Sequence, residues 1–124
     1  MTREEIKEKG RDILQEVRGA RLTSVEFVLN YVILGFDGKG ALTSLVWPEL
    51  TCPDANLTFG MPGYRDRLCE FITKVVENVE SSDDETITFT FREQDRIVIR
   101  LSTYEHPGER AIFTAPKNRL FTWS

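Results

Sequence analysis

The sequence predicts an α+β fold in which two helix-β-β-β units form antiparallel sheet covered by two helices. Strand-like segments of alternating apolar and polar residues follow one another with short turns between them, which is typical of antiparallel sheet. Two further segments place apolar residues at helical spacing, one before each group of strands. At 124 residues the chain has the length of one domain, spanning 1–124.

The first helix is expected to begin after Thr2, whose hydroxyl can cap it, with Glu5 at the third helical position. Gly19 is placed to end this helix. Its apolar face is formed by Ile6, Ile13, Leu14 and Val17.

The stretch 24–38 gives the strongest indication of sheet. Two apolar runs are separated by a break at 29–30 and closed by an Asp-Gly pair at 37–38, a frequent hairpin turn. Strands are therefore expected at 21–28, 31–37 and 41–47. Both faces of the second strand are apolar, which predicts burial on both sides, inside the domain or at a subunit contact. One face carries Val32, Leu34 and Phe36, and the other carries Tyr31 and Ile33.

Residues 48–63 are punctuated by proline and glycine and predict an irregular loop, which is either functional or a plain connection. The second helix is expected at 64–74. Arg65 and Arg67 fall in its first turn, where positive charge is unfavourable against the helix dipole. They are expected to pair with Asp66, Glu70 or a loop acid, or with an anionic ligand.

In the second half, strands are expected at 75–80, 86–92 and 96–103, and their alternation predicts one buried and one solvated face. The buried set is Ile87, Phe89, Phe91, Ile97, Ile99 and Leu101. The segment 119–123 is expected to form an edge strand that packs Phe121 and Trp123 on the core, or to offer Trp123 to a partner.

The two halves follow one plan, which suggests an internal duplication. Residues 22–26 align with 76–80, and the apolar alternation of 32–36 aligns with that of 87–91 after a shift of one residue. The first half is the more apolar on both faces, so a homodimer would cover it if the helices cannot.

Charge and hydropathy argue against two classes of partner. The net charge is -4, whereas nucleic-acid binders present a basic surface. No run approaches the about 20 apolar residues that cross a bilayer. The acidic turn Asp83-Asp84-Glu85 is either a solvated turn or a surface that steers a basic partner. We therefore expect a protein partner or a second copy, and neither nucleic acid nor membrane.

The sequence offers no recognisable catalytic, metal or cofactor site. Cys52 and Cys69 lack metal or redox spacing, and we expect free thiols in a reducing, cytoplasmic compartment. The one histidine, His106, belongs to no cluster, and no pair of carboxylates stands out. An enzyme is the least favoured interpretation.

Two segments resemble a family of short bacterial proteins that has no assigned activity. The first is the run Ser-Val-Glu-Phe-Val at 24–28 with Tyr-Val at 31–32, Leu34 and Phe-Asp-Gly at 36–38. The second matches a Gly-Pro-Glu-Ala-like segment followed by phenylalanine, at 107–113. Here proline and glycine stand in the opposite order and Arg110 precedes Ala111. The resemblance implies a shared fold and a bacterial origin.

The function favoured by the sequence is a non-enzymatic protein-binding module, such as an immunity-like or antitoxin-like inhibitor. The candidate binding surface comprises Arg65, Arg67, Asp83, Asp84, Glu85 and Trp123. The alternative is a small-ligand carrier with a pocket near the aromatic residues Tyr31, Trp47, Phe59 and Tyr104, which could equally belong to the core.

Overall fold

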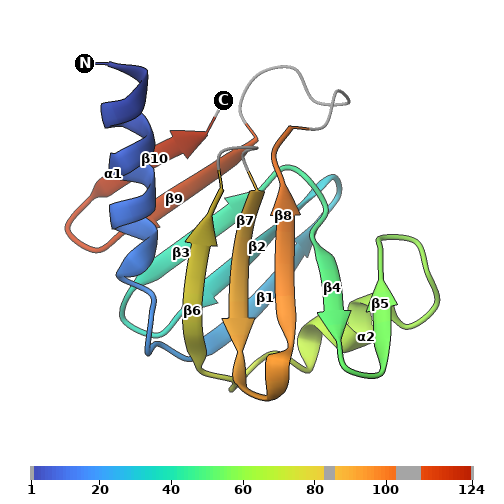
Figure 1. Cartoon of the computed structure of the whole chain (residues 1–124). Coiled ribbons are helices and arrows are strands. Elements are labelled where there is room, and N and C mark those ends of the chain that lie inside the picture. Colours follow the sequence, from blue (N-terminus) through green and yellow to red (C-terminus); the bar gives the residue numbers. More distant parts are fainter. Residues whose placement is uncertain (1, 83–85, 103–109, 124) are drawn as a thin grey trace.

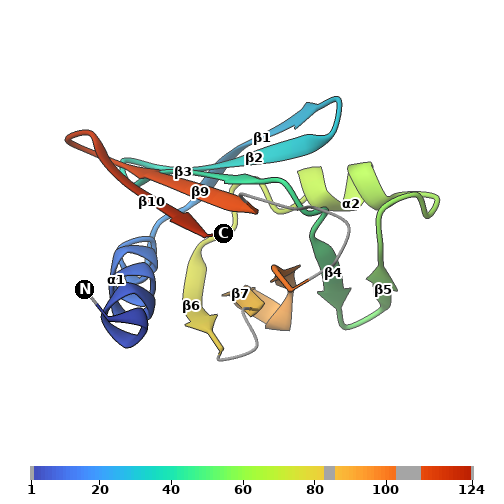
Figure 2. The same cartoon turned by 90° about the horizontal axis from the view of Figure 1, so that it is seen from above.

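A computed structural model describes residues 2–82, 86–102 and 110–123. The fold is α+β, with two helices and two five-stranded antiparallel sheets that face one another (Figure 1, Figure 2). The first sheet has the order β1 (Leu22–Val28), β2 (Tyr31–Phe36), β3 (Gly40–Ser44), β9 (Ala111–Ala115) and β10 (Arg119–Trp123). The second has the order β5 (Ala55–Leu57), β4 (Glu49–Cys52), β8 (Arg96–Arg100), β7 (Thr86–Phe91) and β6 (Val76–Ser81). A short 3-10 turn, Arg92–Gln94, joins β7 to β8.

The core lies between the two sheets, where the inward side chains of both alternate with outward ones. In the second half, the buried set predicted from the sequence is confirmed: each of its members is at most 1% exposed. The rings of Phe36 on β2 and Phe89 on β7 meet across the gap, with centroids 5.3 Å apart. On the outer face of β2, Tyr31 and Ile33 are only partly buried in the single chain. The expected burial of both faces inside the domain is therefore wrong, and burial of the outer face at a subunit contact stays a prediction.

The helix α1 (Arg3–Gln15) is capped as predicted, since the Thr2 hydroxyl accepts a hydrogen bond from the Glu5 N–H at 3.2 Å. Leu14 and Val17 are fully buried, whereas Ile6 is 45% exposed. Gly10 provides the close approach to the C-terminal strand. A Cβ atom at this position would lie 2.9 Å from the ring of Phe121.

The helices occupy the sides of the molecule and do not cover a sheet. In Figure 2, α1 lies beside β10 and β6, whereas α2 (Tyr64–Cys69) lies beside β1 and β4 at the opposite side. The prediction that two helices cover the sheet is thus not confirmed. Each helix closes one open side of the core, and the outer faces of both sheets are left without a helix in the described chain.

Residues 48–63 do not form the predicted irregular loop, because 49–57 form the β4–β5 hairpin. Leu50 pairs with Ile97 of β8, so the hairpin extends the sheet of the second half. In the same way, Phe113 of β9 pairs with Leu42 of β3, and the β9–β10 hairpin extends the sheet of the first half. Each helix is followed by five strands, and the predicted helix-β-β-β unit was too short.

The two halves meet at a crossing of residues 19–22 with residues 73–76, where Arg21 and Val75 form an antiparallel bridge. The hydrogen bonds around this bridge come in equivalent pairs. The N–H groups of Leu22 and Val76 donate to the carbonyls of Lys74 and Ala20, at 2.9 and 2.8 Å. Those of Gly19 and Thr73 donate to the carbonyls of Val76 and Leu22, both at 2.8 Å.

The predicted helix 64–74 ends at Cys69 in the structure. The Thr73 N–H, which a longer helix would direct to the carbonyl of Cys69, donates instead to the carbonyl of Leu22 across the crossing. Gly19 and Thr73 hold equivalent places in it, with φ angles of 84° and 87°. A left-handed conformation suits glycine, whereas a β-branched residue is strained there. Thr73 therefore stores strain that Gly19 avoids.

We expect the substitution Thr73→Gly to raise the free energy of unfolding by about 1 kcal/mol, because relief of the strain exceeds the entropy that glycine adds to the unfolded chain. Urea denaturation followed by circular dichroism would measure the change. Thr88→Gly, in the middle of β7, is the matched control and should lower the same free energy. Equal losses for both variants would contradict the assignment of strain to Thr73.

Candidate functional site

Aromatic side chains from three separate segments gather beside the start of α2. The rings of Trp47 and Phe59 stack with centroids 4.1 Å apart and an interplanar angle of 13°. Phe27 on β1 lies 6.4 Å from Trp47, and Tyr64 meets Phe59 edge-on at 5.8 Å. We call these four rings, together with Arg65, the aromatic–arginine cluster.

Two local anchors hold the cluster in place. The buried Tyr64 hydroxyl donates a hydrogen bond to the carbonyl of Pro48, which ties α2 to the segment carrying Trp47. Burial raises the pKa of Tyr64 above its ordinary value, with a smaller contribution from the Glu49 carboxylate, so the phenol stays neutral. The turn before α2 is closed by the Met61 N–H, which donates to the Thr58 carbonyl at 3.1 Å.

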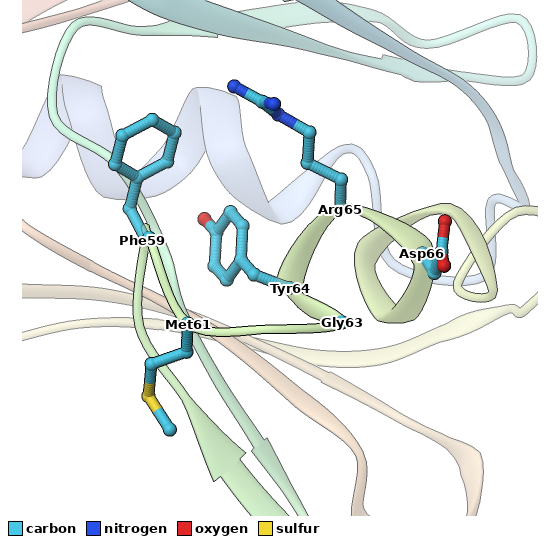
Figure 3. Close-up of a pocket in the computed structure, with 7 residues that line it drawn as sticks. Phe59, Met61, Gly63, Tyr64, Arg65 and Asp66 are labelled. Carbon is cyan, nitrogen blue, oxygen red and sulfur yellow. The ribbon is translucent and has the colours of Figure 1, made fainter.

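Arg65 lies between two rings of the cluster. Its guanidinium carbon is 5.7 Å from the ring centroid of Phe27 and 5.6 Å from that of Phe59, which is the distance of cation–π contacts. Among the described residues, no hydrogen bond or ion pair engages this guanidinium. A pocket of about 250 Å³ opens beside it, lined by residues 59–61 and 63–66. Figure 3 shows Phe59 and Arg65 on the same side of Tyr64, with Met61 turned away.

Arg67 behaves differently, and here the predicted pairing with a loop acid is confirmed. Its two terminal nitrogens each lie 3.0 Å from a carboxylate oxygen of Asp54 in the β4–β5 turn. Glu70 adds a contact of 3.3 Å to the Arg67 Nε. The hydrogen bonds from Arg67 lower the pKa of Asp54, and the same bonds raise the pKa of Arg67. This pair fastens α2 to the hairpin.

A buried polar group lies next to that pair. Asp95 is 6% exposed and forms an ion pair with the ammonium of Lys74, which also lies 5.4 Å from the ring centroid of Phe71. Cys52 is a buried free thiol, and Cys69 is an exposed one. Burial raises the pKa of Cys52, and the charge of Asp95 raises it further, so the thiol is kept protonated and poorly nucleophilic.

The outer faces of the two sheets differ in charge. The register places the following residues on the outer face of the first sheet: Ser24, Glu26, Val28, Tyr31, Ile33, Gly35, Ala41, Thr43, Ile112, Thr114, Leu120 and Thr122. Within the described strands, Glu26 is the one charged residue of this first outer face. The second outer face carries four charged residues, Glu49, Glu80, Arg96 and Arg100, among threonines, asparagines and Val98. Arg100 and Glu49 also bind one another there, with Nε and Oε2 2.6 Å apart.

The structure separates the residues that the sequence had grouped as one binding surface. Arg65 and Arg67 both lie on α2, whereas Trp123 packs against Phe121, 4.6 Å between ring centroids, and against α1 at Gly10. Trp47 and Phe59 of the predicted pocket do meet, but Tyr31 lies on the first outer face. Asp83, Asp84, Glu85, Tyr104 and His106 lie outside the described residues.

In residues 2–82, 86–102 and 110–123, no group of three or more His, Cys, Asp and Glu side chains is placed to hold a metal ion. No helix in the same residues is long and apolar enough to cross a membrane. Comparison with protein-family models, with curated proteins and with solved structures gave no match. The resemblance to a short bacterial family thus stays a prediction.

The Asp54–Arg67 pair should make stability depend on acid pH. The folded state lowers the pKa of Asp54, so the pair stabilises the fold above the ordinary aspartate pKa, and this contribution is lost as the pH falls through the folded-state pKa. We expect Asp54→Asn to unfold at a lower temperature than the wild type at neutral pH, with a difference that shrinks on acidification. Thermal melts over a pH series would measure it, and a difference independent of pH would contradict the pairing.

Proposed function

We propose that this protein is a non-enzymatic protein-binding module whose main interface is the first outer face. The observation that carries the proposal is the charge asymmetry between the two outer faces. An exposed sheet surface is normally decorated with charged residues, as the second outer face is, whereas the first has one. A surface of this kind is typical of an interface core, where charged residues are depleted.

The partner that we propose for the first outer face is a second copy of the chain. On this face, Ile33, Thr43 and Ile112 lie side by side on the three middle strands β2, β3 and β9. Glu26 on β1 and Thr122 on β10 stand at the two ends of the same row. In a two-fold dimer the same patch packs against itself, so an apolar centre meets an apolar centre. The two Glu26 carboxylates then lie at the periphery, where they stay hydrated.

An inhibitor of the immunity or antitoxin type remains our finer proposal for the biological role. The net charge of -4 and the acidic stretch 76–95, in which Arg92 is the one basic residue, support attraction to a basic target. For the cellular location we propose the cytoplasm, and the two free thiols, Cys52 and Cys69, support a reducing compartment.

We also propose that the chain arose by duplication of one helix and the five strands that follow it. The equivalent strand orders and the paired hydrogen bonds of the crossing support this origin. So do two irregularities in register, between Leu22 and Ser24 on β1 and between Val76 and Asn78 on β6. The exchanged hairpins make the two halves interdependent, as expected of a fused dimer.

The double variant Ile33→Lys, Ile112→Lys should convert a dimer to a monomer, because each copy would bring two charges into an apolar contact. Sedimentation equilibrium over a wide concentration range measures the change. The matched control is Thr88→Lys, Thr90→Lys on the second outer face, which should leave the dimer intact. Circular dichroism checks that both variants fold. A wild-type chain that is monomeric at every concentration would contradict the dimer.

A further inference from the structure

We propose that the aromatic–arginine cluster is a second binding site, separate from the first outer face, and that it takes the carboxylate of an acidic side chain beside an apolar side chain in a peptide segment of a partner protein. Arg65 supplies the cation, and Phe59 supplies the apolar contact.

The first step of the argument is the contrast between two arginines on one helical turn. The terminal N–H groups of Arg67 donate hydrogen bonds to Asp54, whereas no described residue accepts a hydrogen bond from the guanidinium of Arg65. An arginine whose faces are covered by rings still presents the in-plane N–H groups at its edge. That edge matches the two oxygens of a carboxylate.

The second step is preorganisation. The contacts with Phe27 and Phe59 confine the Arg65 guanidinium before any ligand arrives, so less side-chain freedom is lost on binding. Phe59 is itself 43% exposed although it stacks on Trp47, and it therefore offers an apolar surface within reach of the same ligand. Arginine and aromatic side chains are enriched among the residues that dominate binding energy at interfaces.

The third step concerns the alternatives. Nucleic-acid bases need a free ring face on which to stack, but Trp47 and Phe59 stack on one another and Arg65 lies over Phe27 and Phe59. Asp66, which also lines the pocket, repels a phosphate dianion about twice as strongly as a singly charged carboxylate at the same distance, so the carboxylate is the favoured anion. At about 250 Å³ the pocket is smaller than the roughly 300–1,000 Å³ of typical small-ligand sites. One carboxylate with one apolar side chain fits this space and charge.

The test uses the blocked dipeptide acetyl-Leu-Glu-amide as the probe and its neutral analogue acetyl-Leu-Gln-amide as the matched ligand. Nuclear magnetic resonance of the arginine Nε–Hε groups follows binding. We expect the acidic probe to shift the Arg65 signal saturably and to leave the Arg67 signal unmoved, since Arg67 is already held by Asp54. The neutral analogue should bind at least about tenfold more weakly, as charge-assisted pairing predicts.

Two variants sharpen the result. Arg65→Gln should abolish the saturable shift of the Phe59 ring signals, and Arg65→Lys, which keeps the charge without the fork, should weaken binding of the acidic probe about tenfold. Backbone amide spectra check that each variant keeps the fold. If Arg65→Gln fails to fold, the Arg65→Lys variant alone tests the proposal. Equal binding of the two dipeptides, or tighter binding of inorganic phosphate or an oligothymidylate, would overturn the proposal. The result does not depend on whether the chain dimerises.

Discussion

The structure depends on the hydrogen-bonded crossing of residues 19–22 with residues 73–76. Both sheets start at this point, because β1 and β6 leave it in equivalent directions from equivalent hydrogen bonds. Once the two strands are fixed there, the inner faces of the sheets stand opposite one another and the rings of Phe36 and Phe89 meet. The chain turns from each helix into this crossing through a positive φ angle, which Gly19 adopts without steric strain and Thr73 adopts with it.

The exchange of hairpins follows from the same arrangement. Each group of three consecutive strands gains two more strands from the other half, so neither half can complete its sheet alone. The helices are then left to close the sides of the core, and the outer faces of both sheets meet solvent or a partner. The different charge of the two outer faces is therefore open to solvent, and it is the observation on which the proposed interface rests.

The two arginines of α2 have different surroundings, and in our proposal one serves structure and the other recognition. Arg67 joins the helix to the β4–β5 turn through Asp54, while Arg65 points to the rings of Phe27 and Phe59. The first contact stabilises the platform on which the second group is presented. Trp47 and Tyr64 extend that platform into the core, which keeps the guanidinium in a defined position.

The sequence by itself determined most strands, the cap of α1, the buried alternation of β7 and β8, and an acid partner for Arg67. These features depend on neighbours along the chain or on a two-residue period, which local patterns record. Tertiary structure decided the rest. β4 and β5 have four and three residues, too few for a periodic signal, and β4 is stabilised by β8 of the other half. The partial exposure of Tyr31 and Ile33 likewise depends on which segments meet in space, because an apolar pattern does not specify what packs against it. The same holds for the different contacts of Arg65 and Arg67, because the helix dipole does not specify which group pairs with a side chain.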